Sequence, residues 1–234
     1  DIYKKRNLSE LLNHLADVEG IEWIRLHYAF PSGFPEDILE TIAARDNICN
    51  YIDMPLQSGS TKMLKLMRRG ITREKTEILI DKIRQKVPDI AIRTTLIAGH
   101  PGETQTEHEE TLGFVEKMQF DRLGVFTYSH EEQTHAFGME DNVPEEEKEA
   151  RAQEIMALQE DISLQHNKAL IGKNLKVLVD RKEGGYFVGR TEYDSPEVDN
   201  EVLLPADDYV RIGDFVQAKI NDATEFDLFG RVVK

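Results

Sequence analysis

The stretch from Asn50 to Gly70, NYIDMPLQSGSTKMLKLMRRG, decides how the chain is expected to fold. Residues 48–54 form a short apolar run that ends at a proline, which is typical of a buried strand. The polar segment 57–60 follows, and residues 61–69 predict a helix with Ser60 at its capping position. Because ligands of parallel α/β proteins bind at the carboxyl ends of the strands, this turn is the first candidate for a binding site.

Strands and helices alternate on both sides of this stretch. Asn7 is placed to cap the first helix, and Thr104 with Glu107 has the spacing of a capping box. Four strands separated by helices predict a parallel sheet with right-handed crossovers. The expected strands are residues 21–29, 48–54, 90–98 and 123–128, and the expected helices carry apolar faces at residues 8–15, 38–42, 61–69, 72–87 and 112–115.

The pattern changes after a polar loop and a long helix that opens at Pro144 and ends near Gly172. Apolar residues then recur at every second position, which is typical of strands. Five short strands within about sixty residues predict a small β-barrel. We therefore divide the chain into residues 1–169 and 170–234. The expected strands are residues 175–179, 186–192, 202–204, 215–220 and 228–233.

Composition limits the classes of function. The 234 residues carry a formal charge of −15, so phosphate backbones would repel the protein unless it had a local basic patch. The single cysteine, Cys49, excludes an internal disulfide and fits a reducing cytoplasm. Because there is no apolar run of 18 residues and no secretory leader opens the chain, we expect a cytoplasmic protein without a membrane partner.

Two turns could bind a ligand. The first is the segment 57–60, which could equally be an ordinary helix cap. The second is LIAGHPGET at residues 96–104, whose glycines would let a ligand approach the backbone. Glu103 in this turn could accept hydrogen bonds from a ribose or an amino group. A purely structural turn is about as good an interpretation of the glycines.

Polar residues also alternate within two of the expected strands, as Arg25 with His27 and Arg93 with Thr95. Such alternation places each pair on one face, which in a barrel can be the interior. A buried arginine requires a carboxylate partner or an anionic ligand, and a salt-bridged core position is the favoured interpretation of each arginine by itself. For a last group, a solvated loop is a better interpretation than a metal site: His130, Glu131, Glu132 and His135.

Together these segments resemble a known family. IDMPLQSGS with MLKLMRRG at residues 52–70, TTLIAGHPGET at 94–104 and VFTYSHEEQT at 125–134 are similar to the later half of the radical S-adenosylmethionine (SAM) barrel of methylthiotransferases. The C-terminal segment resembles their TRAM domain, so the likeness covers nearly the whole chain. GRTEYDSPEVDN at 189–200 and ATEFDLFG at 223–230 resemble the RimO-type branch, which modifies an aspartate of a small-subunit ribosomal protein.

Charge independently favours this branch over the related one that modifies tRNA. Residues 168–234 contain ten Lys or Arg against thirteen Asp or Glu, a net charge of −3. A module that grips tRNA is expected to be basic, because neutralisation of phosphates dominates its affinity. An acidic module suits a basic ribosomal protein instead.

The resemblance implies an α/β fold, part of a TIM-type barrel, followed by a small all-β TRAM barrel of OB-like form. It also implies radical insertion of a methylthio group, with S-adenosylmethionine and a [4Fe–4S] cluster as cofactors. The chain would contribute positioning and exclusion of water. By the same resemblance, Gln57 and Ser58 line the nucleotide and sulfonium site, and Arg93 pairs with the methionine carboxylate. The turn that would face the ribose and adenine contains Gly99, Gly102 and Glu103. Tyr128 would lie at the end of the next strand.

Two kinds of departure from the family stand out. The three closely spaced cysteines that hold the cluster are absent, and Cys49 alone cannot replace them. We therefore expect a C-terminal fragment that is inactive by itself, with no catalytic or metal-binding residue of its own. His100 and Gln133 stand where the family usually has an aromatic residue and a glycine. The alternatives are a fragment of a tRNA methylthiotransferase, a non-catalytic substrate-binding module, or a small α/β enzyme of unrelated chemistry.

Overall fold

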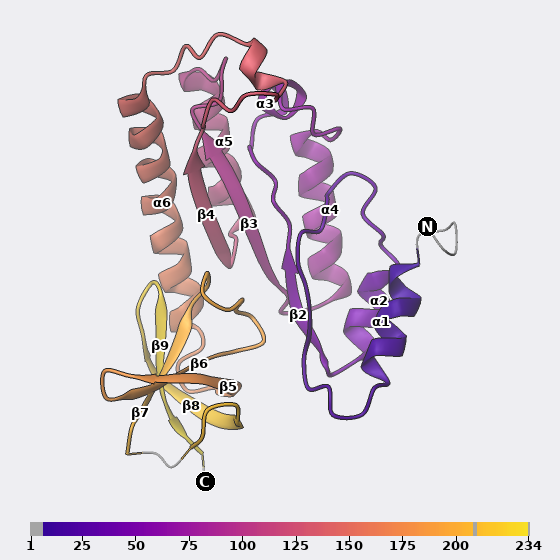
Figure 1. Cartoon of the computed structure of the whole chain (residues 1–234), viewed down its shortest axis with the longest axis vertical. Coiled ribbons are helices and arrows are strands. Elements are labelled where there is room, and N and C mark those ends of the chain that lie inside the picture. Colours follow the sequence, from indigo (N-terminus) through magenta and orange to yellow (C-terminus); the bar gives the residue numbers. More distant parts are fainter. Residues whose placement is uncertain (1–6, 208–209, 234) are drawn as a thin grey trace.

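The computed structural model describes residues 7–207 and 210–233 and contains two separate sheets, each with its own core (Figure 1). The first sheet is parallel throughout, in the order β1-β2-β3-β4, as the alternation of strands and helices predicts. Its first strand is much shorter than the expected range of residues 21–29. The strands are β1 (Ile24–Leu26), β2 (Ile48–Asp53), β3 (Ala91–Ala98) and β4 (Arg122–Thr127).

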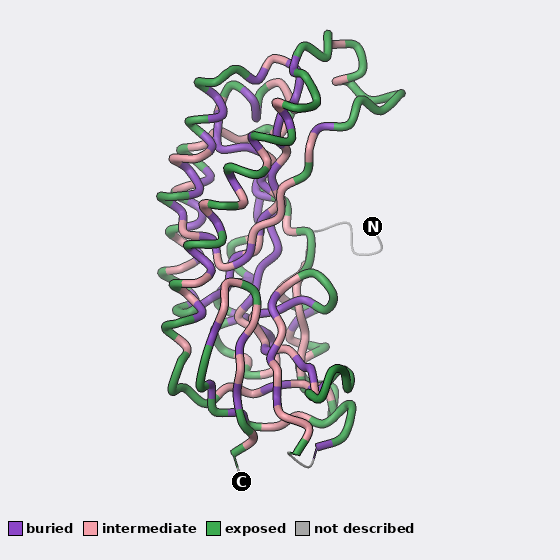
Figure 2. Tube along the Cα trace, turned by 90° about the vertical axis from the view of Figure 1, so that its left-hand side faces the viewer, coloured by how far each residue is buried: buried purple, intermediate pink, exposed green. Residues whose placement is uncertain are grey.

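The helices of this half cover one face of the parallel sheet. Alternate strand residues such as Ile52, Ile92 and Leu96 point toward these helices and share one core with them. Figure 2 shows the buried positions running along the strands and recurring along the helices. Over the described residues, none of the helices combines the length and the apolar character that crossing a membrane requires. The helices are α1 (Leu8–Ala16), α2 (Ile38–Ala44), α3 (Thr61–Leu66), α4 (Arg73–Lys86), α5 (Gln105–Met118), the 3₁₀ helix η1 (Ala136–Gly138) and α6 (Glu145–Lys168).

The second sheet is a closed barrel in the order β5-β6-β7-β9-β8, and it confirms the prediction of five short strands. Val177, Val202 and Leu228 lie at the centre of its small core. The long helix α6 begins directly after Pro144, as predicted, and leads from the first half into this barrel (Figure 1). The strands are β5 (Asn174–Glu183), β6 (Tyr186–Arg190), β7 (Glu201–Pro205), β8 (Phe215–Ala223) and β9 (Asp227–Val232).

Two predicted helix caps are wrong, and one is confirmed. Asn7 donates to Glu10 and does not cap α1 through its side chain. The Ser60 hydroxyl has no hydrogen-bond partner among the described residues and does not cap α3, while the Ser60 N–H donates to the Ser58 hydroxyl at 3.1 Å. The capping box forms: the Glu107 carboxylate accepts from the Thr104 N–H at 2.9 Å and thereby starts α5.

Gly59 lies in close contact with α5. A Cβ at this position would lie 2.5 Å from the Phe114 Cβ and 2.8 Å from the Thr111 Cα, closer than packed atoms approach. The turn between β2 and α3 therefore needs a glycine so that it can rest on the neighbouring helix.

We expect Gly59→Ala to lower the free energy of unfolding by about 2 kcal/mol or more, because the added methyl group overpacks this contact. The matched control is Gly113→Ala in α5, where a Cβ would meet nothing within 4 Å. That change removes backbone entropy from the unfolded chain and should stabilise by about 0.5–1 kcal/mol. Urea denaturation measures both, and equal stability of the two variants would contradict the close contact.

The capping box also predicts a dependence of stability on pH. Burial opposes the charge of Glu107, but its hydrogen bonds with Thr104 and Lys62 outweigh burial and lower its pKa from 4.5 to about 2. The unfolded chain therefore binds this proton first as the pH falls. We expect the stability advantage of the wild type over Glu107→Gln to be complete above pH 4.5 and to disappear as the pH falls toward about 2. Denaturation at several pH values measures it, and an advantage independent of pH would contradict the role of the charge.

Candidate functional site

A cavity of about 780 Å³ opens at the carboxyl ends of β2, β3 and β4, on the face of the sheet that the helices leave uncovered. This is the edge at which parallel α/β proteins bind ligands, and the volume is in the range of small-molecule sites. Its polar lining includes three of the predicted site residues, Gln57, Arg93 and Tyr128, and its apolar lining includes Pro55, Ile97 and Phe126.

Gln57 reaches the cavity because the chain continues to pair with β3 after the end of β2. The Gln57 N–H donates to the Thr95 carbonyl and its carbonyl accepts from the Ile97 N–H, both at 2.9 Å. Its φ of 75° is in the left-handed region, which is uncommon for a residue with a side chain. The backbone bonds on both sides hold this conformation and fix the position of the side chain at the rim.

The structure gives the other predicted residues of the two turns partners within the protein. Ser58 is buried, and its hydroxyl faces the Thr111 hydroxyl and the Ser60 N–H. The Glu103 Oε1 accepts from the Gly99 N–H at 3.0 Å and from Arg151 of α6 at 2.9 Å. This oxygen is therefore satisfied inside the turn, which differs from the expected contact with a ribose.

Glycines shape the second turn, as predicted, but neither lines the cavity. The Gly102 N–H donates to the Asn142 side chain at 3.0 Å, and a Cβ on Gly102 would lie 3.3 Å from Leu66 of α3. A Cβ on Gly99 would lie 2.2 Å from the Lys148 side chain. The second turn thus packs against α3, α6 and the loop before α6, and the glycines permit this packing.

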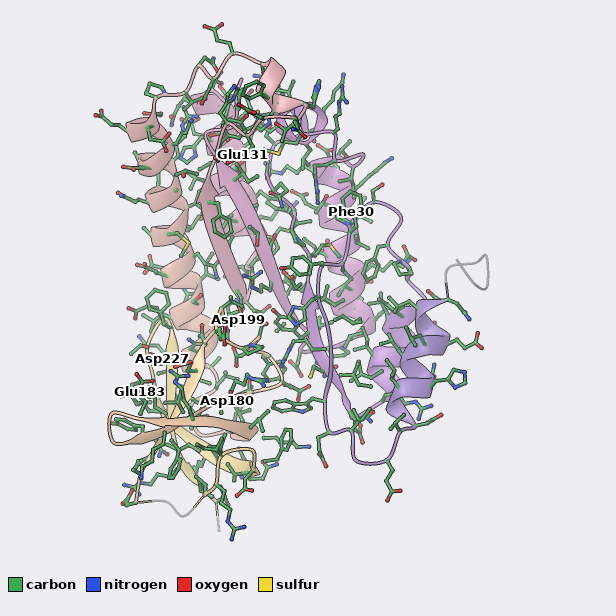
Figure 3. All side chains as sticks on the ribbon, viewed as in Figure 1. Phe30, Glu131, Asp180, Glu183, Asp199 and Asp227 are labelled. Carbon is green, nitrogen blue, oxygen red and sulfur yellow. The ribbon has the colours of Figure 1, made fainter. Side chains whose placement is uncertain are left out.

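Aromatic rings form one side of the cavity mouth. Tyr128 packs edge-on against His100 at 5.1 Å between ring centroids, and its hydroxyl lies 3.0 Å from the His130 Nδ1. Burial lowers the pKa of His100, so its ring is neutral at pH 7, and its Nδ1 donates to the Pro101 carbonyl. Glu131, labelled in Figure 3, also lines the cavity. His100, which stands where the family usually has an aromatic residue, thus packs against Tyr128 at the lining of the cavity.

Arg93 lies deeper, between two carboxylates. Its Nη1 donates to Asp53 and its Nε to Asp199, each at 3.0 Å. Burial opposes the charge on Arg93, but the two carboxylates outweigh it and raise the pKa of the guanidinium. The predicted carboxylate partner of a buried arginine is therefore present, and Arg93 does not depend on a ligand for charge compensation. The other predicted arginine, Arg25, donates to the carbonyls of Thr191 and Glu192.

The sequence analysis did not predict several residues of the cavity lining, among them Phe126 and Val198. Phe126 stands in the motif at the end of β4, and its alternation with Tyr128 was a usable signal for an inward position. Val198 belongs to the loop between β6 and β7, more than sixty residues further along the chain than Tyr128. No local pattern indicates that it lies in this cavity.

The described residues do not fit a [4Fe–4S] cluster. No group of three potential metal-binding side chains occurs among residues 7–207 and 210–233. Cys49 is buried in the sheet, and burial raises its pKa to about 11, so it is a protonated thiol.

Comparisons with known proteins point to one family. The sequence model of the Radical SAM superfamily matches residues 3–115, and that of the TRAM domain matches residues 171–233. The ribosomal protein uS12 methylthiotransferase RimO of Cytophaga hutchinsonii is 67% identical over the whole chain, which covers 54% of that relative. RimO of Chlorobaculum tepidum is 53% identical over 99% of the chain, which again covers 54% of the relative. The chain thus spans about half the length of the curated relatives that it matches.

One solved structure supports the fold of the first half. Coproporphyrinogen III oxidase (HemN) from Escherichia coli, a radical SAM enzyme, matches 66% of this chain and 36% of its own with a TM-score of 0.52 and 23% identity. The fold prediction of part of a radical SAM barrel followed by a TRAM barrel is confirmed. The chain thus combines a region that matches the Radical SAM superfamily with a TRAM domain, and the relatives that it resembles along its whole length are named ribosomal protein uS12 methylthiotransferase RimO.

Proposed function

We propose that this chain is part of a methylthiotransferase that attaches a methylthio group to an aspartate of ribosomal protein uS12. The observation that carries this proposal is the 67% identity to a RimO relative along the whole chain, through both the parallel sheet and the C-terminal barrel. The target would be a small-subunit ribosomal protein, which places the protein in the cytoplasm. The boundary between the two units lies near residue 170 in this proposal.

The cavity at the carboxyl ends of the strands is proposed as the binding site for S-adenosylmethionine. Gln57, Arg93 and Tyr128 supply its polar contacts, while Phe126 and His100 supply flat surfaces against which an adenine can stack. Ser58, Gly99, Gly102 and Glu103 keep their assignment to this site as the residues that shape the two turns behind it. When bound, S-adenosylmethionine together with a reduced [4Fe–4S] cluster supplies the radical chemistry.

The chain's own residues position the cofactor and exclude water. Because the described residues do not fit the cluster, its ligands would have to come from outside this chain, and the chain alone is proposed to be inactive. The cavity volume of about 780 Å³ is large enough for a nucleoside with an amino-acid tail. Tyr128 is held by the His130 contact and by Lys148, whose Nζ lies 5.3 Å from the centre of the tyrosine ring.

The C-terminal barrel is proposed to bind the protein substrate. Its β5 strand carries Asp180 and Glu183, and Figure 3 shows that both lie in the barrel together with Asp227. Asp180 pairs with Arg190 and Glu183 with Arg181, so it is the net charge of −3 for residues 168–234 that favours a basic protein partner over tRNA.

Truncation of Phe126 tests the proposed S-adenosylmethionine site. This ring is largely exposed in the cavity, so its loss should not disturb the core. We expect Phe126→Ala in the full-length, cluster-loaded protein to weaken binding of S-adenosylmethionine about tenfold, through the loss of a stacking surface. Phe226→Ala, an equally simple truncation of an exposed ring on the barrel, should leave affinity unchanged. Isothermal titration measures both. Absence of binding by the wild type at millimolar ligand would remove the cofactor assignment.

Removing negative charge from the barrel tests whether its partner is a basic protein. We expect Asp180→Asn with Glu183→Gln to weaken the capture of purified uS12 several-fold at low salt, and the difference to shrink as salt screens the charges. Glu116→Gln, an exposed carboxylate on α5, is the matched control and should have no effect. The pull-down includes tRNA as competitor. Retention of tRNA in preference to uS12 would favour the tRNA-modifying branch instead.

A further inference from the structure

The loop between β6 and β7, residues 191–200, leaves the C-terminal barrel and packs on the uncovered face of the parallel sheet (Figure 1). Asp194 forms a buried ion pair with Arg122 at the start of β4, at 2.6 Å. The Glu192 carboxylate accepts from the Asn50 N–H of β2 at 3.0 Å. We call these ten residues the floor loop.

The floor loop covers only the amino-terminal half of the sheet. Its contacts are with residues near the starts of the strands, whereas the cavity is lined by residues near their ends. Arg93 belongs to both halves, because it contacts the floor loop and lines the cavity. Val198 of the floor loop also lines the cavity. A segment of the C-terminal barrel therefore closes the bottom of the pocket that the parallel sheet forms.

Asp199 is the buried residue of the floor loop that contacts Arg93. Its side chain is 2% exposed. Its Oδ1 accepts from the Arg93 Nε at 3.0 Å, and its Oδ2 accepts from the Tyr51 hydroxyl at 2.9 Å and from the Ser195 N–H at 2.8 Å. The last bond lies within the loop, so the same carboxylate shapes the floor loop and holds the arginine. Figure 3 shows Asp199 at the top of the barrel, facing the lower end of the parallel sheet.

This arrangement leaves one edge of the guanidinium free. The Arg93 Nε and Nη1 are bound to the two carboxylates, while Nη2 has no hydrogen bond among the described residues, and the side chain keeps 17% of its exposure. Because Asp53 and Asp199 already balance the positive charge, the free N–H groups suit a hydrogen-bond acceptor such as a carbonyl or a single carboxylate better than a highly charged phosphate.

We propose that the floor loop of the C-terminal barrel is part of the ligand cavity, and that Asp199 is a positioning residue that aims the free edge of Arg93 at an acceptor group of the bound ligand. The buried Asp194–Arg122 pair already fastens the loop to the sheet without lining this cavity. The contact between Asp199 and Arg93 is a second link between the loop and the sheet, and its arginine does line the cavity. The inference rests on the proposed function only for the choice of S-adenosylmethionine as probe.

The first measurement needs no ligand. The Arg93 Nε–H signal of the ¹⁵N-labelled chain, identified by its loss in Arg93→Lys, should exchange with solvent slowly in the wild type. Asp199→Ala should accelerate this exchange about tenfold or more, because the acceptor is gone, and Asp199→Asn should retain part of the protection. Asp194→Ala, which removes an equally buried carboxylate of the same loop, should leave the signal unchanged.

The second measurement is the affinity of the full-length, cluster-loaded protein for S-adenosylmethionine. Asp199→Ala should weaken it about tenfold or more, Asp199→Asn should restore part of the loss, and Asp194→Ala should change it less than about threefold. Equal losses in the two alanine variants would mean that the loop acts only through stability and would overturn the proposal. So would wild-type affinity and an unchanged Arg93 signal in Asp199→Ala.

The two measurements separate this proposal from the proposed function. If the wild type fails to bind S-adenosylmethionine, the cofactor assignment is lost, and the exchange of the Arg93 proton decides the role of Asp199. Faster exchange in Asp199→Ala alone would then support the positioning role, and unchanged exchange would refute it.

Discussion

The Arg93 guanidinium, held between Asp53 of its own sheet and Asp199 of the C-terminal barrel, is the interaction that joins the cavity wall to the barrel, beside the buried Arg122–Asp194 pair that fastens the same loop. A buried charge is tolerated only when it is paired and hydrogen-bonded, and removing one partner of such a group costs more than the pair contributes. The three side chains therefore restrict where the barrel can lie against the sheet. The same restriction brings Val198 into the cavity lining.

The cavity exists because different elements cover the two faces of the parallel sheet, and one of these faces is covered only in part. Helices cover one face and form the main core with Ile52, Ile92 and Leu96. On the other face, the C-terminal barrel covers only the starts of the strands, through its loop at residues 191–200. The ends of the strands remain open, and there the turns after β2 and β3 place Gln57 and the aromatic rings.

The match to the Radical SAM superfamily agrees with this arrangement of the sheet and its cavity. The residues of this chain line a cavity and hold its wall, and they offer no thiolate for a cluster, since Cys49 is a buried, protonated thiol. Radical chemistry needs a cofactor whose reactive atoms are held in one geometry and shielded from water. The pairing of Gln57 with β3 and the two carboxylates around Arg93 hold both residues in place at the cavity that we propose as the cofactor site.

The sequence by itself determined the features that depend on neighbouring residues. Alternation of strands and helices predicted the parallel sheet, the period of two predicted the five-stranded barrel, and the Thr104–Glu107 spacing predicted the capping box. The resemblance of the motifs predicted the family and the candidate residues Gln57, Arg93 and Tyr128. It could do so because these motifs lie in and just after the strands of the parallel sheet.

Tertiary structure alone decided which groups became partners. The Ser60 hydroxyl is buried without capping α3, and Glu103 turned inward because Arg151, far along the chain on α6, offers a buried donor. Arg93 and Asp199 are separated by 106 residues. No local pattern encodes such a pair, because it forms only where the packing of two independent cores brings two polar groups together away from water.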